Sequence, residues 1–119
     1  MKTSGFHHIQ ISVTNIERSL EFYKGLMGME IAFKTDGLVF LRTPGGNDLL
    51  TLRPTDEPVN PDGEGLQHFG FSIEAEDFDA ALAEAKQFGA EILSSGSWGG
   101  RQGSRYAYIK DPDGYVIEL

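Results

Sequence analysis

The chain has no cysteine among its 119 residues, so it forms no disulfide and no thiolate metal site, and it offers no cysteine nucleophile. Basic residues are also scarce. Ten Lys and Arg stand against eighteen Asp and Glu, which leaves a net charge of −8 and a sequence pI near 4.7. An acidic surface repels phosphate backbones and anionic lipid, so neither nucleic acid nor a membrane is an expected partner.

Long apolar runs are missing as well. No stretch approaches the roughly 20 residues that span a bilayer, and the opening MKTSGFHHIQ has no apolar core of the signal-peptide type. We therefore expect a cytoplasmic protein. Hydrophobic residues make up 39% of the chain and charged residues 24%, which is close to the average for globular proteins, so the chain is expected to fold.

Glycine and proline divide the chain near its middle. Three of the five prolines fall in PTDEPVNPDGEG, residues 54–65, a composition typical of a linker or a long surface loop. A length of 119 residues suits one domain. We expect that domain to contain two modules, 6–54 and 66–119, joined by a linker over 55–65.

The two modules show the same order of elements. Apolar runs predict strands, and apolar residues at helical spacing predict one helix in each module. In the first module we expect strands over 6–13, 29–33, 38–42 and 49–53, and a helix over 16–27 between Asn15 and Gly28. In the second we expect strands over 68–73, 91–93, 106–110 and 115–119, and a helix over 77–88 that stops at Gly89 and buries Phe78, Leu82, Ala85 and Phe88. Each module is thus predicted to be β-α-β-β-β, an α+β fold.

The modules also match residue by residue. HIQISV at 8–13 aligns with HFGFSI at 68–73, and FLRTPGG at 40–46 aligns with YIKDPDG at 108–114. After a slip of one residue, LLTL at 49–52 aligns with VIEL at 116–119. A unit of about 55 residues buries its own sheet poorly. We therefore expect the copies to pack around an approximate two-fold axis and to form a cupped mixed sheet.

Four equivalent positions carry the candidate chemistry. Strand side chains alternate between faces, so His8 and His68 on the first strands, and Thr51 and Glu118 on the last, are predicted to project from the polar face. Two neutral imidazoles and a carboxylate bind a divalent ion and leave coordination sites open, which admits Fe, Mn, Zn or Ni. The alternative for each histidine is an ordinary strand residue, and Thr51 is better explained as a strand threonine than as a ligand.

The same face carries side chains suited to contact a substrate. The residues with the parity to line the cavity are Gln10, Ser12, Thr51 and Arg53. Among these, Arg53 is suited to pair with an anionic substituent. The glycine-rich stretch 94–104, with Trp98 and Arg101, is a candidate lid, or else a surface loop without a role.

The duplication, the opening HHIQISV, the later HFGFSI and the terminal DPDGYVIEL together resemble the vicinal oxygen chelate superfamily. This group contains glyoxalase I, extradiol dioxygenases, fosfomycin-resistance enzymes and bleomycin-resistance proteins. The resemblance covers the whole chain and places the family's metal ligands on His8, His68 and Glu118. It also places Tyr108 where extradiol and fosfomycin enzymes often carry an active-site tyrosine, with simple packing as the alternative. Small members commonly form dimers, so a homodimer is implied.

The resemblance implies a metal-dependent enzyme that acts on a small molecule, and dioxygenase-like oxygen chemistry on a catechol-like substrate is the first interpretation. Glyoxalase-type or fosfomycin-type lyase or thiol-transferase chemistry is one alternative, and a metal-free binding protein of the bleomycin-resistance type is another. Thr51 stands where glyoxalase I has a glutamate ligand, which weakens an isomerase interpretation. Gln10 replaces a threonine that fosfomycin transferases usually carry. Extradiol enzymes use further histidines near the metal, whereas strand alternation is expected to point His7 away from His8.

Overall fold

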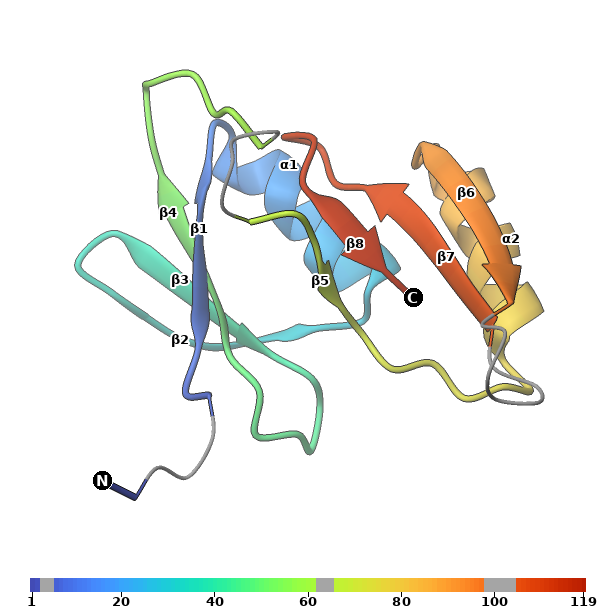
Figure 1. The fold of residues 1–119 in the computed structure, drawn as a ribbon. Coiled ribbons are helices and arrows are strands. Elements are labelled where there is room, and N and C mark those ends of the chain that lie inside the picture. Colours follow the sequence, from blue (N-terminus) through green and yellow to red (C-terminus); the bar gives the residue numbers. More distant parts are fainter. Residues whose placement is uncertain (3–5, 62–65, 98–104) are drawn as a thin grey trace. The chain divides into compact units, whose positions relative to one another are not determined.

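The computed structural model describes residues 1–2, 6–61, 66–97 and 105–119, and the chain divides into two compact units, Met1–Val59 and Asn60–Leu119 (Figure 1). Each unit has the order strand, helix, three strands. Trp98 and Arg101 of the predicted lid lie outside the described residues. None of the helices in the described part of the chain has the length and apolar character needed to cross a membrane.

The first unit is a four-stranded sheet with one interrupted helix. Its elements are β1 (Ile9–Val13), α1 (Ile16–Leu20), the π-helical η1 (Glu21–Leu26), β2 (Glu30–Thr35), β3 (Leu38–Arg42) and β4 (Leu50–Pro54). The strand order is β1-β4-β3-β2, and β1 runs parallel to β4 while the other neighbours are antiparallel. Alternation along β1 buries Ile11 and Val13, as expected for the aliphatic face.

The second unit repeats this plan. Its elements are β5 (Phe69–Gly70), α2 (Phe78–Phe88), β6 (Ile92–Ser97), β7 (Arg105–Lys110) and β8 (Val116–Glu118). The strand order is β5-β8-β7-β6, with β5 parallel to β8. Both units therefore form mixed sheets, and the predicted α+β fold of two β-α-β-β-β modules is confirmed.

The repeat extends to the register of the strands. In the first unit β1 pairs Gln10 with Thr51, and β3 pairs Phe40 with Thr51. The equivalent pairs of the second unit are Gly70 with Glu118 and Tyr108 with Glu118. The strand partners of Thr51 and Glu118 are therefore equivalent, as the sequence alignment of the two modules predicts. A register shift also recurs, between Ile31 and Phe33 in β2 and between Ile92 and Ser94 in β6.

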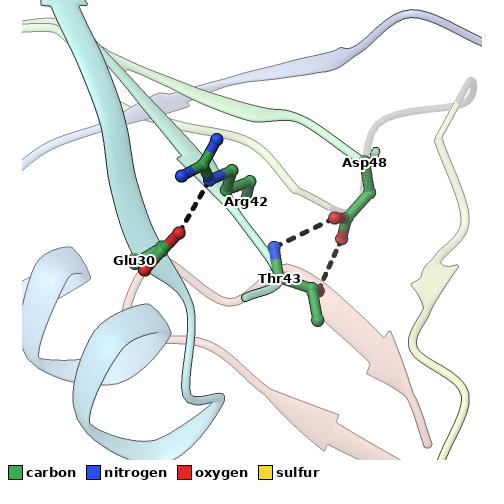
Figure 2. A network of polar contacts seen from close by, with 4 residues as sticks. All are labelled: Glu30, Arg42, Thr43 and Asp48. Carbon is green, nitrogen blue, oxygen red and sulfur yellow. Dashed lines mark hydrogen bonds and ion pairs between the residues drawn. The ribbon is translucent and has the colours of Figure 1, made fainter. Parts of the chain in front are cut away.

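The turn that separates the last two strands differs between the units. In the first unit the Asp48 carboxylate accepts hydrogen bonds from the backbone N–H and hydroxyl of Thr43 at 2.9 and 2.7 Å, as Figure 2 shows. Beside it, Arg42 pairs with its cross-strand partner Glu30 at 2.7 Å. In the second unit the Asp111 carboxylate accepts from the N–H groups of Asp113 and Tyr115 instead. This shorter turn accounts for the one-residue slip in the alignment.

The first strand of each unit is shorter than predicted. β1 begins at Ile9, not at residue 6, and β5 covers only Phe69 and Gly70 of the predicted 68–73. The ladder of β5 stops because its partner β8 ends at Glu118, whose carbonyl accepts the N–H of Phe71 at 2.8 Å. His8 and His68 therefore lie directly before the first strands and not on them.

The first helix is not a regular helix over 16–27. Asn15 caps it as predicted, with its side-chain oxygen accepting the N–H of Arg18 at 3.0 Å, but five α-helical residues are followed by a π-helical turn. There the N–H of Met27 bonds to the carbonyl of Phe22, five residues back. The wider turn allows the adjacent rings of Phe22 and Tyr23 both to be buried.

Two further expectations fail in the second unit. Residues 94–97 of the predicted lid belong to β6, where backbone pairing with β7 holds a segment with few apolar side chains. Gly96 permits this because a Cβ there would lie 2.9 Å from the hydroxyl of Tyr106. The helix over 77–88 is confirmed up to its stop at Gly89, but Phe88 in its last turn remains 44% exposed.

Candidate functional site

Three side chains of the second unit lie together at the ends of neighbouring strands. His68 precedes β5, and its Nε2 lies 3.1 Å from Oε2 of Glu118 on the parallel neighbour β8. Tyr108, the cross-strand partner of Glu118 on β7, holds its ring 5.3 Å from the His68 ring in an edge-on arrangement. The fold thus brings the imidazole of His68 together with a phenol 40 residues later and a carboxylate 50 residues later in the sequence.

The spacing of His68 and Glu118 suits two ligands of one metal ion. Donor atoms at about 2.0–2.2 Å from a shared ion lie roughly 3 Å from each other, which is the separation found here. Both side chains reach solvent, with 39% and 24% of their surface exposed, so an ion has access. Over the described residues no group of three His, Asp or Glu side chains is placed to hold a metal, so the pair has no third partner within its own unit. The pair fits a divalent cation and leaves room for a ligand from elsewhere.

Tyr108 is held in its protonated form. Partial burial raises the pKa of its phenol above the ordinary value, and repulsion by the negative charges of Glu118 and of ionised Tyr106 raises that pKa further. Burial and the nearby carboxylate both disfavour the phenolate, burial the more strongly. Tyr108 is therefore a hydrogen-bond donor at neutral pH and not a base.

The first unit places the predicted residues differently. His8 lies next to Phe40, with their ring centroids 6.2 Å apart. Thr51 lies on β4, between β1 and β3. It is completely buried, and its hydroxyl has no hydrogen-bond partner among the described residues. Thr51 is therefore not exposed in this structure, and its predicted contact with a substrate stays a prediction. Its cross-strand neighbour Gln10 is exposed.

The other two predicted lining residues are cross-strand partners. Ser12 on β1 pairs with Arg53 on β4 in the parallel ladder. Ser12 is partly buried, whereas Arg53 is exposed. Gln10 and Arg53 therefore remain available to contact a small molecule.

His7 contradicts the expectation from strand alternation. Its Nδ1 lies 2.8 Å from Nδ1 of His8, and the two rings meet edge to face with their centroids 5.1 Å apart. The alternation of side chains between the faces of a strand does not apply to these residues, because β1 begins only at Ile9 and both histidines precede it. The two imidazoles can then turn toward each other.

Sequence reasoning also overlooked the aromatic surroundings of His8. Phe40 is the counterpart of Tyr108 in the repeat, so each unit sets an aromatic ring beside its histidine. Phe40 in turn stacks on Phe33 of β2, with centroids 4.3 Å apart and planes 17° from parallel. The alignment at 40–46 contained this signal, because it matched Phe40 to Tyr108 directly.

Comparison with known proteins assigns the chain to a family. Residues 5–119 match the family model of the Glyoxalase/Bleomycin resistance protein/Dioxygenase superfamily. The chain belongs to this superfamily, as the strand order and the repeat of the two units indicate. The predicted resemblance is thereby confirmed.

The similar proteins are named for several different activities. The chain is 30% identical to a metallothiol transferase FosB of Shouchella clausii over 98% of its own length and 79% of that protein. It is 29% identical to a catechol-2,3-dioxygenase of Bacillus subtilis over 94% of its length but only 39% of that protein. The crystal structure of the fosfomycin resistance protein FosX from Listeria monocytogenes superposes with a TM-score of 0.82 at 20% identity, covering 99% of this chain and 93% of that one, which shows the shared fold.

Proposed function

We propose that the protein is a metal-dependent enzyme in which His8, His68 and Glu118 hold one divalent ion, Fe, Mn, Zn or Ni. Its substrate is a small molecule that presents two oxygens to that ion. Dioxygenase-like chemistry on a catechol-like substrate is the first reaction that we assign to it. The observation that carries this proposal is the 3.1 Å approach of the His68 imidazole and the Glu118 carboxylate beside a protonated Tyr108.

The ligand set supports oxygen chemistry. Two neutral histidines and one carboxylate leave a divalent ion with a net positive charge and open positions, and such an ion stabilises negative charge on substrate oxygens. His8 is included because it occupies the position in the first unit that His68 occupies in the second, directly before the first strand. Thr51, the counterpart of Glu118, is buried and uncharged, so it supplies no second carboxylate.

The remaining side chains have separate tasks in this proposal. Tyr108 donates its hydroxyl proton to a hydrogen bond with a substrate oxygen, since its phenol is protonated at neutral pH. Gln10 orients the substrate through its amide, and Arg53 pairs with an anionic substituent. Both are exposed, as a contact with a diffusing molecule requires.

Thiol transfer is the second candidate. The match to the metallothiol transferase spans 79% of that protein, whereas the match to the catechol dioxygenase spans 39% of its length. Since this chain has no cysteine, the transferred thiol would have to be a diffusible one. The ion and Tyr108 would then activate an oxygen of the acceptor, such as an epoxide, for attack by that thiol.

The test begins with metal content. The protein is reconstituted with Fe²⁺ without oxygen, and bound metal is measured for the wild type, for Glu118→Gln and for the matched control Glu91→Gln, an exposed glutamate of the same unit. We expect one ion per chain in the wild type and the control, and a fall to below about a tenth of that in Glu118→Gln, because loss of a charged ligand weakens the site.

The loaded wild type is then assayed for oxygen uptake on a catechol panel and for thiol consumption on an epoxide panel. Oxygen uptake that depends on Glu118 supports the dioxygenase-like reaction, and thiol consumption with the same dependence supports the second candidate. A protein that binds aromatic ligands yet retains no stoichiometric metal would be a binding protein of the bleomycin-resistance type and would refute both.

A further inference from the structure

The two adjacent histidines of the first unit form a contact that the proposed metal site does not explain. His7 Nδ1 and His8 Nδ1 are 2.8 Å apart, which is hydrogen-bond distance for two nitrogens. A neutral imidazole carries one proton on one of its two nitrogens. At this distance one Nδ1 must carry the proton and the other must accept it, because two bare lone pairs would repel and two protons would collide.

The direction of this hydrogen bond determines which nitrogen of His8 is free. If His7 donates, the proton of neutral His8 sits on Nε2 and that nitrogen cannot bind a cation. If His8 donates from Nδ1, its Nε2 carries an unshared lone pair. Metal-bound histidines generally donate their second ring N–H to an acceptor, which fixes both the tautomer and the ring orientation.

The repeat indicates which nitrogen is needed. In the second unit the nitrogen of His68 that faces Glu118 is Nε2. His8 is the counterpart of His68 and its Nδ1 is already engaged by His7, so Nε2 is the nitrogen it has to offer. His7 therefore has to act as the acceptor.

We propose that His7 is a positioning residue: its Nδ1 accepts the Nδ1–H of His8, and this selects the tautomer of His8 whose Nε2 is free to bind a cation. The consequence for metal binding rests on the proposed function, whereas the tautomer itself is a property of the metal-free chain. His7 does not touch the substrate or the metal in this arrangement.

Two substitutions separate the hydrogen bond from simple ring packing. His7→Phe keeps a ring for the edge-to-face contact with His8 but removes the acceptor nitrogen. His7→Asn removes the ring but keeps an acceptor, because its Oδ1 is bonded to Cγ as Nδ1 is. Gln67→Leu, at the equivalent position of the second unit, is the matched control.

The tautomer is read by long-range ¹⁵N–¹H NMR of the metal-free protein at about pH 8, where an ordinary imidazole is neutral. We expect His8 to be protonated at Nδ1 in the wild type, in His7→Asn and in Gln67→Leu, and to shift toward the Nε2-protonated form in His7→Phe. A wild-type His8 protonated at Nε2 overturns the proposal. So does a His7→Phe protein in which His8 keeps the Nδ1 proton, since that would make His7 a packing residue only.

Zinc titration supplies the second readout. We expect His7→Phe to weaken Zn²⁺ binding about 10- to 100-fold relative to the wild type, and His7→Asn to restore most of the affinity. Loss of the Nδ1 proton of His8 on addition of Zn²⁺ would show that Nδ1 and not Nε2 binds the ion, and would overturn the positioning role. If the wild type has the Nδ1 tautomer but binds no zinc, the proposed function fails while the assignment of the hydrogen bond stands.

Discussion

Tyr108 illustrates how neighbouring groups decide the chemistry of one side chain. The sequence placed it on a strand with the correct parity, but a strand tyrosine that only packs has the same pattern. The structure adds that His68 and Glu118 border it and that the pKa of its phenol is raised by burial, by Glu118 and by Tyr106. The phenol, protonated at neutral pH like an ordinary tyrosine, thus keeps its proton to higher pH and lies beside the proposed ligands.

Tyr108→Phe tests this donor directly. The variant should retain metal, since the phenol is not a proposed ligand, but its turnover should fall about 10²- to 10⁴-fold, the usual contribution of a positioned proton donor. In the metal-free protein the phenol should lose its proton only above about pH 10, because its pKa is raised by burial and by the charges of Glu118 and Tyr106. Ultraviolet titration of the metal-free protein checks this pKa, turnover with metal analysis checks the donor, and unchanged turnover would assign Tyr108 to packing.

At the scale of elements, periodicity predicted the type of most segments and missed several of their limits. Helix α2 was located because its N-terminal neighbour Asp77 and the stop at Gly89 bracket an apolar stripe. β5 was predicted too long because the length of a strand is limited by its partner, and β8 ends at Glu118. The π-helical turn η1 escaped prediction because its residues have the apolar spacing of an ordinary helix.

The end of α2 gives a prediction on backbone conformation. Gly89 has φ of +90° and nothing lies within 4 Å of where a Cβ would be placed, so its substitution carries a conformational cost without a clash. Gly89→Ala should lower the free energy of unfolding by about 1 kcal/mol, and Gly89→Asn by less, since Asn tolerates the left-handed region better. Urea denaturation measures both, and an Ala variant as stable as the wild type would contradict this account.

For the whole molecule, the duplication provides two cores of the same design. Leu41 on β3 and Ile109 on β7 are counterparts in the repeat, and both are fully buried in their sheets. Their cross-strand partners, Leu50 and Ile117, are also counterparts and are also buried. Each unit therefore depends on the same central contact.

Leu41→Ala and Ile109→Ala are expected to be similarly costly. Each should lower the free energy of unfolding by about 2–5 kcal/mol, because the cavity in a sheet core collapses only in part. Leu93→Ala, at a residue that is 42% exposed, is the control and should change it by about 0.5 kcal/mol or less. Equilibrium unfolding in urea checks all three. A loss below about 1 kcal/mol for either buried variant would show that its unit does not depend on this contact.

The sequence by itself determined the duplicated β-α-β-β-β plan. It also determined that Thr51 is the repeat counterpart of Glu118 and Phe40 that of Tyr108, and it supplied the candidate residues His8, His68 and Glu118. It could do so because strand alternation and a repeated pattern are local properties of the chain. The tertiary structure alone decided that His68 and Glu118 approach within 3.1 Å, that Thr51 is buried and that His7 turns toward His8. Those facts depend on where each strand ends and on what covers it, and only long-range packing sets both.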